Sequence, residues 1–162
     1  MNYTNLKQAI QDYTENTETS FVNHLDDFIK QAEQRIYNTV QLPALRKNST
    51  GKTTASTTYI ETPDDFLAPY SLAVISSSVY TYLLNKDVNW IREAYNNAST
   101  TGLPKYYALF DDNTLLLAPT PDVAYDLELH YYHYPSSIVS QSTTWLGDNY
   151  LYERGCRPFS GV

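Results

Sequence analysis

The sequence is poor in cysteine, since Cys156 is the only one among its 162 residues. A single cysteine excludes an intramolecular disulfide framework, and this one lacks the neighbouring Cys or His spacing of a structural zinc site. We therefore expect folding that does not depend on oxidation, and no cofactor.

Positive charge and long apolar runs are also scarce. Eleven Lys and Arg stand against 18 Asp and Glu, which gives a formal net charge of −7. Proteins that bind DNA tightly use clustered Lys and Arg to displace counterions from the phosphates, and an excess of acidic residues argues against such binding here. No segment approaches the roughly 18 consecutive apolar residues of a membrane span, and residues 1–15 lack the pattern of a signal peptide. We expect a protein made in the cytoplasm that makes no membrane contact.

Glycine is infrequent and charged residues make up only 18% of the chain, whereas tyrosine occurs 16 times. The surface must therefore be covered largely by Ser, Thr, Asn and Tyr. Tyrosine combines a rigid apolar ring with a polar tip, which suits protein contacts. The length fits one domain with a core of its own. We expect a helical part over residues 1–43, a β-rich part over 44–135 and a C-terminal tail over 136–162.

Two amphipathic helices are expected in the first forty residues. Apolar side chains spaced by three and four residues predict a short helix over residues 5–13, with Thr4 as its N-cap. A longer pattern begins near the Asp26-Asp27 pair, stops at Pro43 and has its apolar positions at Leu25, Phe28, Ile29, Ala32, Ile36 and Val40. We expect the two helices to pack as a hairpin, with this stripe in the core.

The pattern becomes extended after residue 44. A Thr-rich run follows Gly51, and we interpret residues 45–60 as an exposed, protruding hairpin with its turn at residues 49–51. Pro69 interrupts a later apolar run and indicates an edge or a bend there. Further strands are expected at residues 66–75, 79–84, 105–110 and 114–118, with a short helix at 88–95.

The clearest strand runs from Tyr125 to Tyr134. Leu127 and Leu129 fall on one face and Glu128 on the other, with the period of two that a half-buried strand requires. Helices followed by several strands predict an α+β fold. We expect an N-terminal helical hairpin packed with an antiparallel β-sheet or sandwich.

Motifs that could carry chemistry have simpler structural explanations. Gly51-Lys52-Thr53 resembles the end of a phosphate-binding loop, but the first glycine of that motif would fall at Arg46. His130 and His133 are an odd number of residues apart on a strand, so they point to opposite faces. Paired carboxylates fit helix starts and turns better than an acid–base pair, and they are Asp26-Asp27, Asp64-Asp65 and Asp111-Asp112. We predict that the protein is not an enzyme and holds no metal.

Three short segments carry a resemblance to a known family. Residues 63–67 (PDDFL), 102–107 (GLPKYY) and 117–121 (LAPTP) are similar to segments of the head-to-tail adaptor proteins of tailed bacteriophages, including the podovirus type called tail tubular protein A. The resemblance extends to about Trp145. Family members usually continue there into a long helix, whereas this chain carries Gly155 and Pro158, which disfavour one.

The resemblance implies a structural virion protein in the neck, between head and tail, assembled in the host cytoplasm. Its partners would be the portal protein, the tail or nozzle protein and other copies of itself in a dodecameric ring. Genomic DNA would pass through the ring without specific binding, past a wall of like charge.

We hypothesise that the arm at residues 47–60 reaches a neighbouring subunit or the tail component, and that the aromatic C-terminal tail wedges against the portal. The candidate interface residues are Lys47, Thr50, Lys52, Thr54, Tyr59, Tyr150, Tyr152, Arg154, Arg157 and Phe159.

The alternative is a β-rich, carbohydrate-binding recognition module of a tail apparatus. Its stacking surface would be formed by Tyr106, Tyr107, Tyr131 and Tyr132. A sugar platform needs several coplanar rings on one exposed face, but half of these tyrosines must point inward on their strands.

Overall fold

A computed structural model describes residues 2–97 and 99–141 of the chain. These residues form two compact units. The helical unit comprises residues 2–44 and 135–141, and the β unit comprises residues 45–134.

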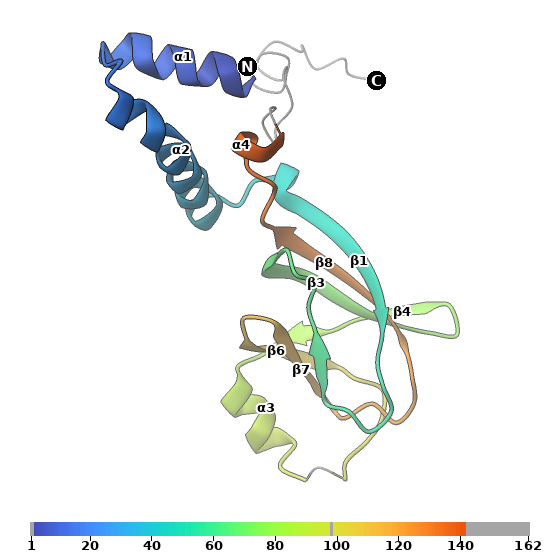
Figure 1. Ribbon diagram of the computed structural model, residues 1–162. Coiled ribbons are helices and arrows are strands. Elements are labelled where there is room, and N and C mark those ends of the chain that lie inside the picture. The colour runs from blue at the N-terminus through green and yellow to red at the C-terminus, as the bar shows by residue number, and fades with distance from the viewer. Residues whose placement is uncertain (1, 98, 142–162) are drawn as a thin grey trace, which may run out of the picture. The chain divides into compact units, whose positions relative to one another are not determined.

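Three helices form the helical unit, namely α1 (Tyr3–Thr14), α2 (Thr19–Thr39) and α4 (Ile138–Gln141) (Figure 1). The N-cap of α1 is Asn2, whose side-chain oxygen accepts a hydrogen bond from the Asn5 N–H at 2.8 Å. The prediction of Thr4 as the cap is therefore wrong. An Asn side chain at this position satisfies one of the free N–H groups of the first turn.

The second helix begins earlier than expected. Asp26 and Asp27 lie in its interior, because α2 starts at Thr19. The turn before it is closed by Asn16, whose side-chain oxygen accepts a hydrogen bond from the Glu18 N–H at 3.0 Å. The polar residues at 19 and 20 thus belong to the first turn of α2. Their composition suggested that they belong to the break between the two helices, and that expectation is wrong.

The buried face of α2 differs from the predicted stripe. It consists of residues four apart, which are Leu25, Ile29, Glu33 and Tyr37. Phe28, Ile36 and Val40 of the predicted stripe remain 49%, 42% and 41% exposed. The expectation that the whole stripe lies in the core is wrong, because only a single row of residues along the helix is covered.

Contacts of Asp26 join α1 to α2. Its carboxylate oxygen Oδ1 accepts a hydrogen bond from the Tyr3 hydroxyl and one from the Lys7 ammonium, the latter at 3.0 Å. These two donors, the tyrosine first, hold the pKa of Asp26 below its ordinary value. The two helices are thus held together by polar contacts near the surface, and α1 contributes no buried residue.

Two four-stranded sheets form the β unit. The first sheet has the order β1-β8-β3-β4 and is antiparallel, and the second has the order β2-β7-β6-β5, with β5 parallel to β6. The strands of the first are β1 (Arg46–Lys52), β8 (Asp126–His133), β3 (Phe66–Ser76) and β4 (Val79–Tyr82). Those of the second are β2 (Tyr59–Glu61), β7 (Thr114–Ala118), β6 (Tyr106–Asp111) and β5 (Leu84–Asn85). A 3-10 turn at Pro43–Leu45 precedes β1.

The main core lies between the two sheets. Val74 of the first sheet and Leu115 and Leu117 of the second are fully buried, and they belong to one apolar cluster with Leu72, Leu127, Leu129 and Tyr131. Helix α3 (Val88–Ala94) covers part of the other face of the second sheet (Figure 1), where Ile91 packs with Leu116. Because β7 is covered on both faces, it is buried over four consecutive residues rather than at alternate ones.

Residues 45–60 do not form a hairpin. β1 is a continuous strand that pairs with β8 along its whole length, and Gly51 lies in the ladder opposite Leu127. The chain turns at residues 53–58 and enters the second sheet as β2, which pairs with β7. Threonine-rich composition indicates extended chain but not its partner, and here the long-range pairing with β8 replaces a local hairpin.

A projecting hairpin does exist, but β3 and β4 form it (Figure 1). Its turn residues Ser77 and Ser78 both have positive φ, 49° and 65°, the combination found in two-residue turns that match the twist of the strands. β4 pairs only with residues 73–76 of β3, so Pro69 lies beyond that pairing, where β3 also shifts register against β8. The expectation of an edge or bend at Pro69 is confirmed.

The second predicted hairpin and the short helix are confirmed. β6 and β7 are joined at residues 112–113, where the Asp111 side chain accepts a hydrogen bond from the Asn113 N–H at 2.9 Å. Asp87 caps α3 in the same way, by accepting from the Asn89 N–H at 2.8 Å. The strand at residues 125–134 is also present, as β8.

Candidate protein interface

Five of the ten candidate interface residues belong to the described part of the chain, and all five are exposed. They lie on β1, on the connection that follows it and on β2, and they are Lys47, Thr50, Lys52, Thr54 and Tyr59. The other five, Tyr150, Tyr152, Arg154, Arg157 and Phe159, lie outside the described residues. β1 and β2 are each a terminal strand of their sheet, and residues of both line one groove, which places the two strands at one edge of the β unit.

Lys47 is held by a carboxylate rather than left free. Its ammonium lies 2.6 Å from Oδ2 of Asp65, and the hydroxyl of Tyr131 donates to Oδ1 at 2.7 Å. Burial alone would raise the pKa of Asp65, but these two hydrogen bonds outweigh it and lower the pKa. The pKa of Tyr131 is raised, first by burial and then by its bond to Asp65.

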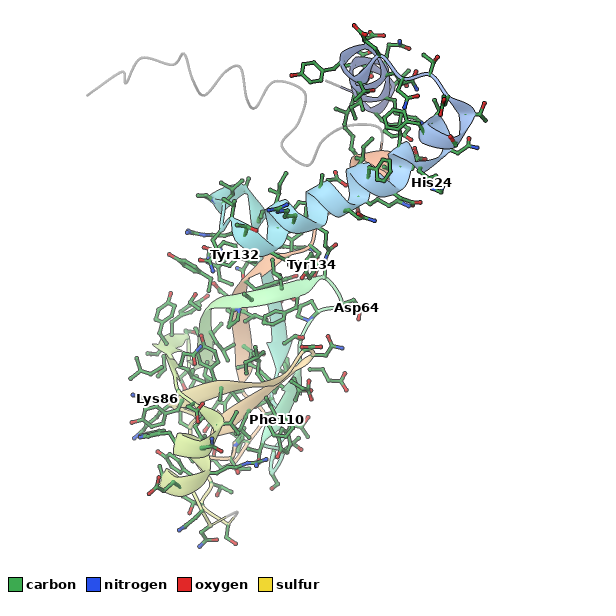
Figure 2. The ribbon with its side chains drawn as sticks, turned by 90° about the vertical axis from the view of Figure 1, so that its left-hand side faces the viewer. His24, Asp64, Lys86, Phe110, Tyr132 and Tyr134 are labelled. Carbon is green, nitrogen blue, oxygen red and sulfur yellow. The ribbon has the colours of Figure 1, made fainter. Side chains whose placement is uncertain are left out.

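The neighbouring aspartate behaves differently. Asp64, labelled in Figure 2, is exposed, whereas Asp65 is partly buried against Tyr131. Asp65 therefore ties the start of β3 to β1 and β8, so Asp64 and Asp65 do not form a free carboxylate pair.

The residues of β1 alternate between two faces of the first sheet. Lys52 lies 3.1 Å from Asp126 across the ladder, and Thr50 is on the same outer face. Ser49 and Gly51 are opposite the buried Leu129 and Leu127, so their side of β1 faces the second sheet. Small residues at these two positions leave the space beside them unfilled.

A groove of about 520 Å³ occupies that space, between β1 and β2. Leu72, Leu127 and Leu129 form apolar parts of its wall. A Cβ added at Gly51 would meet nothing within 4 Å. Four of the candidate residues border the groove, namely Thr50, Lys52, Thr54 and Tyr59. The groove is thus open at the edge of the β unit, while the three leucines in its wall are themselves buried.

Thr53, noted from the sequence only as part of the Gly51-Lys52-Thr53 motif, fixes the connection after β1. It is buried, its N–H donates to the Tyr125 C=O at 2.9 Å, and its hydroxyl accepts from the Tyr125 N–H at 2.8 Å. The exposed Thr54 follows directly. Tyr59 rests on Phe110, labelled in Figure 2, with ring centroids 5.1 Å apart. These contacts give the exposed edge a defined shape.

A second exposed surface, at β4, was not anticipated as functional. Val79, Tyr80 and Tyr82 are 62%, 51% and 65% exposed. The signal in the sequence is the run Val-Tyr-Thr-Tyr, which contains neither charge nor proline. Exposed edge strands usually carry charged residues or proline, because these prevent pairing with other chains. β4 has neither.

The tyrosines proposed as a sugar-stacking platform do not form one. Tyr107, Tyr131 and Tyr132 are buried. Tyr106 is partly buried, with its ring edge-on to Trp90 at a centroid separation of 5.0 Å. Four rings that are mostly in the interior cannot present coplanar faces to a sugar.

The histidines and acidic residues give no metal-binding cluster within residues 2–97 and 99–141. His130 lies beside the ring of Tyr70, with centroids 5.0 Å apart, whereas Nδ1 of His133 is 2.8 Å from the Leu45 carbonyl oxygen. Gly51-Lys52-Thr53 lies on an extended strand and the residue after it, not in a phosphate-binding loop. None of the helices in the described part of the chain is long and apolar enough to cross a membrane.

One comparison with known proteins identifies a family. The family model of the SU10 adaptor protein matches residues 1–156. No curated protein matches the chain.

Proposed function

The chain belongs to the SU10 adaptor protein family, which is a family of phage head-to-tail adaptors, and we propose that its copies form a dodecameric ring in the virion neck. The ring joins the portal protein of the head to the tail or nozzle protein. It assembles in the host cytoplasm and performs no catalysis. The observation that carries this proposal is the family match over nearly the whole chain.

The exposed edge of the β unit supplies a surface for such contacts. Thr50, Thr54 and Tyr59 border an open groove, and the neighbouring lysines Lys47 and Lys52 already have carboxylate partners within the subunit. An edge with satisfied charges, an exposed tyrosine and an open groove is suited to covering by another protein. We propose that this edge binds a neighbouring subunit or the tail component.

The remaining candidate residues are assigned to the portal. Tyr150, Tyr152, Arg154, Arg157 and Phe159 combine aromatic rings with guanidinium groups, the residue types that contribute most at protein interfaces. In this proposal they wedge against the portal protein.

The charge of the chain suits passage of DNA. A formal net charge of −7 per copy gives the ring an overall negative charge, and like charge on the wall prevents phosphate contacts that would retain the genome. The assembled ring should therefore leave the electrophoretic mobility of double-stranded DNA unchanged at moderate salt. Retention of the DNA would contradict this part of the proposal.

Ring formation is tested by native mass spectrometry of the chain alone and mixed with its portal protein. We expect a complex that contains twelve copies in the mixture. Persistence of the monomer in both samples, together with absence of the chain from the necks of purified virions, would overturn the proposed function.

Tail attachment is tested with point substitutions. Deletion of residues 49–57 is unsuitable because it removes more than half of β1 and the buried Thr53. Thr50→Glu places a charge on the candidate edge and should reduce tail attachment in a particle-assembly assay. Thr100→Glu, at another exposed threonine in the loop after α3, is the matched control and should leave attachment unchanged.

A further inference from the structure

The first sheet ends in two strands that each lack a partner on one side among the described residues. The order β1-β8-β3-β4 places β1 at one end and β4 at the other. Both are therefore able to accept another strand by hydrogen bonding of the backbone.

The hydrogen-bond register shows which backbone groups of β4 are turned outward. The Leu83 N–H donates to the Leu72 C=O at 2.9 Å, in the register of the β3–β4 ladder. Alternate residues of an antiparallel strand turn both backbone groups to the same neighbour, so Val79 and Thr81 face β3. Tyr80 and Tyr82 consequently turn their N–H and C=O groups away from the sheet.

The same reasoning applies to β1. The Thr53 N–H donates to the Tyr125 C=O at 2.9 Å, in the register of the β1–β8 ladder. Ser49 and Gly51 therefore direct their backbone groups to β8, and Asn48 and Thr50 turn theirs outward. On each edge, two alternate residues thus turn their backbone N–H and C=O groups outward.

The directions of the two edges are also compatible. Three antiparallel pairings separate β1 from β4, so these strands run in opposite directions within one subunit. A second copy that is related by rotation about an axis close to the strand direction presents its β1 antiparallel to the β4 of the first. The antiparallel ladder can therefore continue from the first sheet of one copy into that of the next.

We infer that β4 of one copy pairs with β1 of the next, which makes the first sheets of neighbouring subunits continuous. The register places Val79 opposite Gly51 of the next copy, Tyr80 opposite Thr50, and Tyr82 opposite Asn48. This inference rests on the proposed ring and specifies the surfaces that build it. The contact joins two different edges, as a closed ring of many subunits requires.

Side-chain space selects this register. Val79 lies on the same face as the buried Val74, which is the face turned to the second sheet. In the next copy it therefore points into the groove beside Gly51, where a Cβ has nothing within 4 Å. Val79 would fill part of this groove, which is open at the edge of the isolated subunit.

Charge does not oppose the pairing. β4 contains no ionisable side chain other than its tyrosines. On β1, Lys47 and Lys52 are each within 3.1 Å of a carboxylate oxygen of their own subunit, Asp65 and Asp126 respectively. The approach of another strand therefore does not bury an unpaired ammonium group at either lysine.

Engineered cysteines test the register. Thr50→Cys and Tyr80→Cys in one chain, with Cys156→Ser, place thiols at positions that face each other only between copies. Within one subunit β1 and β4 are three strand spacings apart, roughly 14 Å, which a disulfide cannot span. Oxidation of the ring assembled on the portal should give a ladder of covalently linked copies on a denaturing gel. Thr50→Cys with Tyr82→Cys, two residues out of register, should give at least tenfold less.

Charge substitution provides a second measurement that does not depend on disulfide geometry. Val79 is largely exposed in the subunit, so Val79→Asp should leave the thermal midpoint of the free chain unchanged. In the ring the same carboxylate would be covered, and assembly on the portal should fall at least tenfold. Ser78→Asp adds the same charge one residue away, outside β4, and should assemble normally.

The outcomes separate this inference from the proposed function. A ring of normal size on the portal, with no cross-linked copies and no effect of Val79→Asp, would overturn the pairing of β4 with β1 and leave the adaptor function standing. Cross-linking of the Thr50→Cys thiol to the portal or tail protein would also overturn it. Failure of the unmodified chain to form any ring would instead count against the proposed function itself.

Discussion

The two units of the molecule use their apolar residues differently. In the β unit the apolar side chains of both sheets meet, and Val74, Leu115 and Leu117 are completely buried. In the helical unit α1 buries no residue, and one of the four buried positions of α2 is a carboxylate, Glu33. The β unit is therefore stabilised by a core between its sheets, whereas the helical unit buries few apolar side chains of its own.

The exposed surface of the helical unit is regular. Phe28 and Ile36 lie on one side of α2 together with the exposed Ala32, at intervals of four residues, and the exposed Val40 follows as the C-cap residue. Residues with this spacing form a ridge on a helix, which is the geometry that packs into a groove of a second helix. The difference between the units predicts that substitutions in the core of the β unit act mainly on stability, and those on this ridge mainly on assembly.

The largest effect is expected in the core of the β unit. Leu117→Ala should lower the free energy of unfolding by about 2 to 5 kcal/mol, because it removes a buried side chain and leaves a cavity. Ile10→Ala in α1, where no residue is buried, is the matched comparison and should cost under about 1 kcal/mol. Urea unfolding followed by circular dichroism measures both. Equal losses would show that the two units are not stabilised differently.

Acid sensitivity should be located in the β unit at Asp65. Its pKa is lowered in the folded protein, so it contributes stability above its unfolded value, near 3.8, and loses it as the pH falls through the folded value. Asp65→Asn should reduce stability at pH 7 by about 1 to 3 kcal/mol and reduce the further loss between pH 5 and pH 2.

The adjacent Asp64→Asn is the control for that measurement. Asp64 is exposed and should leave both the stability at pH 7 and the acid transition of the wild type unchanged. Thermal midpoints measured across this pH range for both variants decide the assignment. A pH dependence retained in full by Asp65→Asn would contradict it.

A smaller and local effect is expected in the helical unit at Glu33. Its carboxylate oxygen Oε1 accepts a hydrogen bond from the Ile138 N–H at 3.0 Å and so ties α4 to α2. Glu33→Ala should cost about 1 kcal/mol or somewhat more, through the unsatisfied N–H. Faster hydrogen exchange of the Ile138 amide, with unchanged exchange in the β unit, is the expected result. Gln34→Ala, at an exposed neighbour, serves as control.

The smallest effect is expected at an exposed ion pair of the β unit. Lys52 and Asp126 are both well exposed, and such pairs contribute between about 0 and 1 kcal/mol. Lys52→Met should therefore hardly change the urea midpoint, in contrast to Leu117→Ala in the same unit. A loss comparable to that of the core variant would mean that the edge, and not only the core, stabilises the β unit.

Local periodicity was sufficient to predict much of the fold. The alternation in β8, the turn between β6 and β7, and the short helix α3 were predicted from neighbouring residues, because a strand or a turn displays its pattern within ten residues. The α+β class follows from the order of these elements.

Long-range pairing was not predictable in the same way. The Thr-rich segment after Gly51 indicated extended chain, yet β1 pairs with β8, nearly eighty residues further along the chain, and β2 pairs with β7 in the second sheet. The start of α2 was also missed, since Thr and Ser at its first turn are typical of both loops and helix starts. For the candidate edge, composition predicted that Thr50 and Tyr59 are exposed, but the exposure of β4 depends on which strands happen to flank it.

The unlike edges of the first sheet have a consequence for the behaviour of the purified chain. A pairing between two identical edges is complete once two molecules have met, but one that joins β4 to β1 always leaves a further β4 and β1 available at its ends. Growth would then stop only when the last copy reaches the first. If the angle between successive copies is not held to a fraction of a full circle, the product is an open filament that lengthens with protein concentration, and the portal would serve as the template that sets this angle.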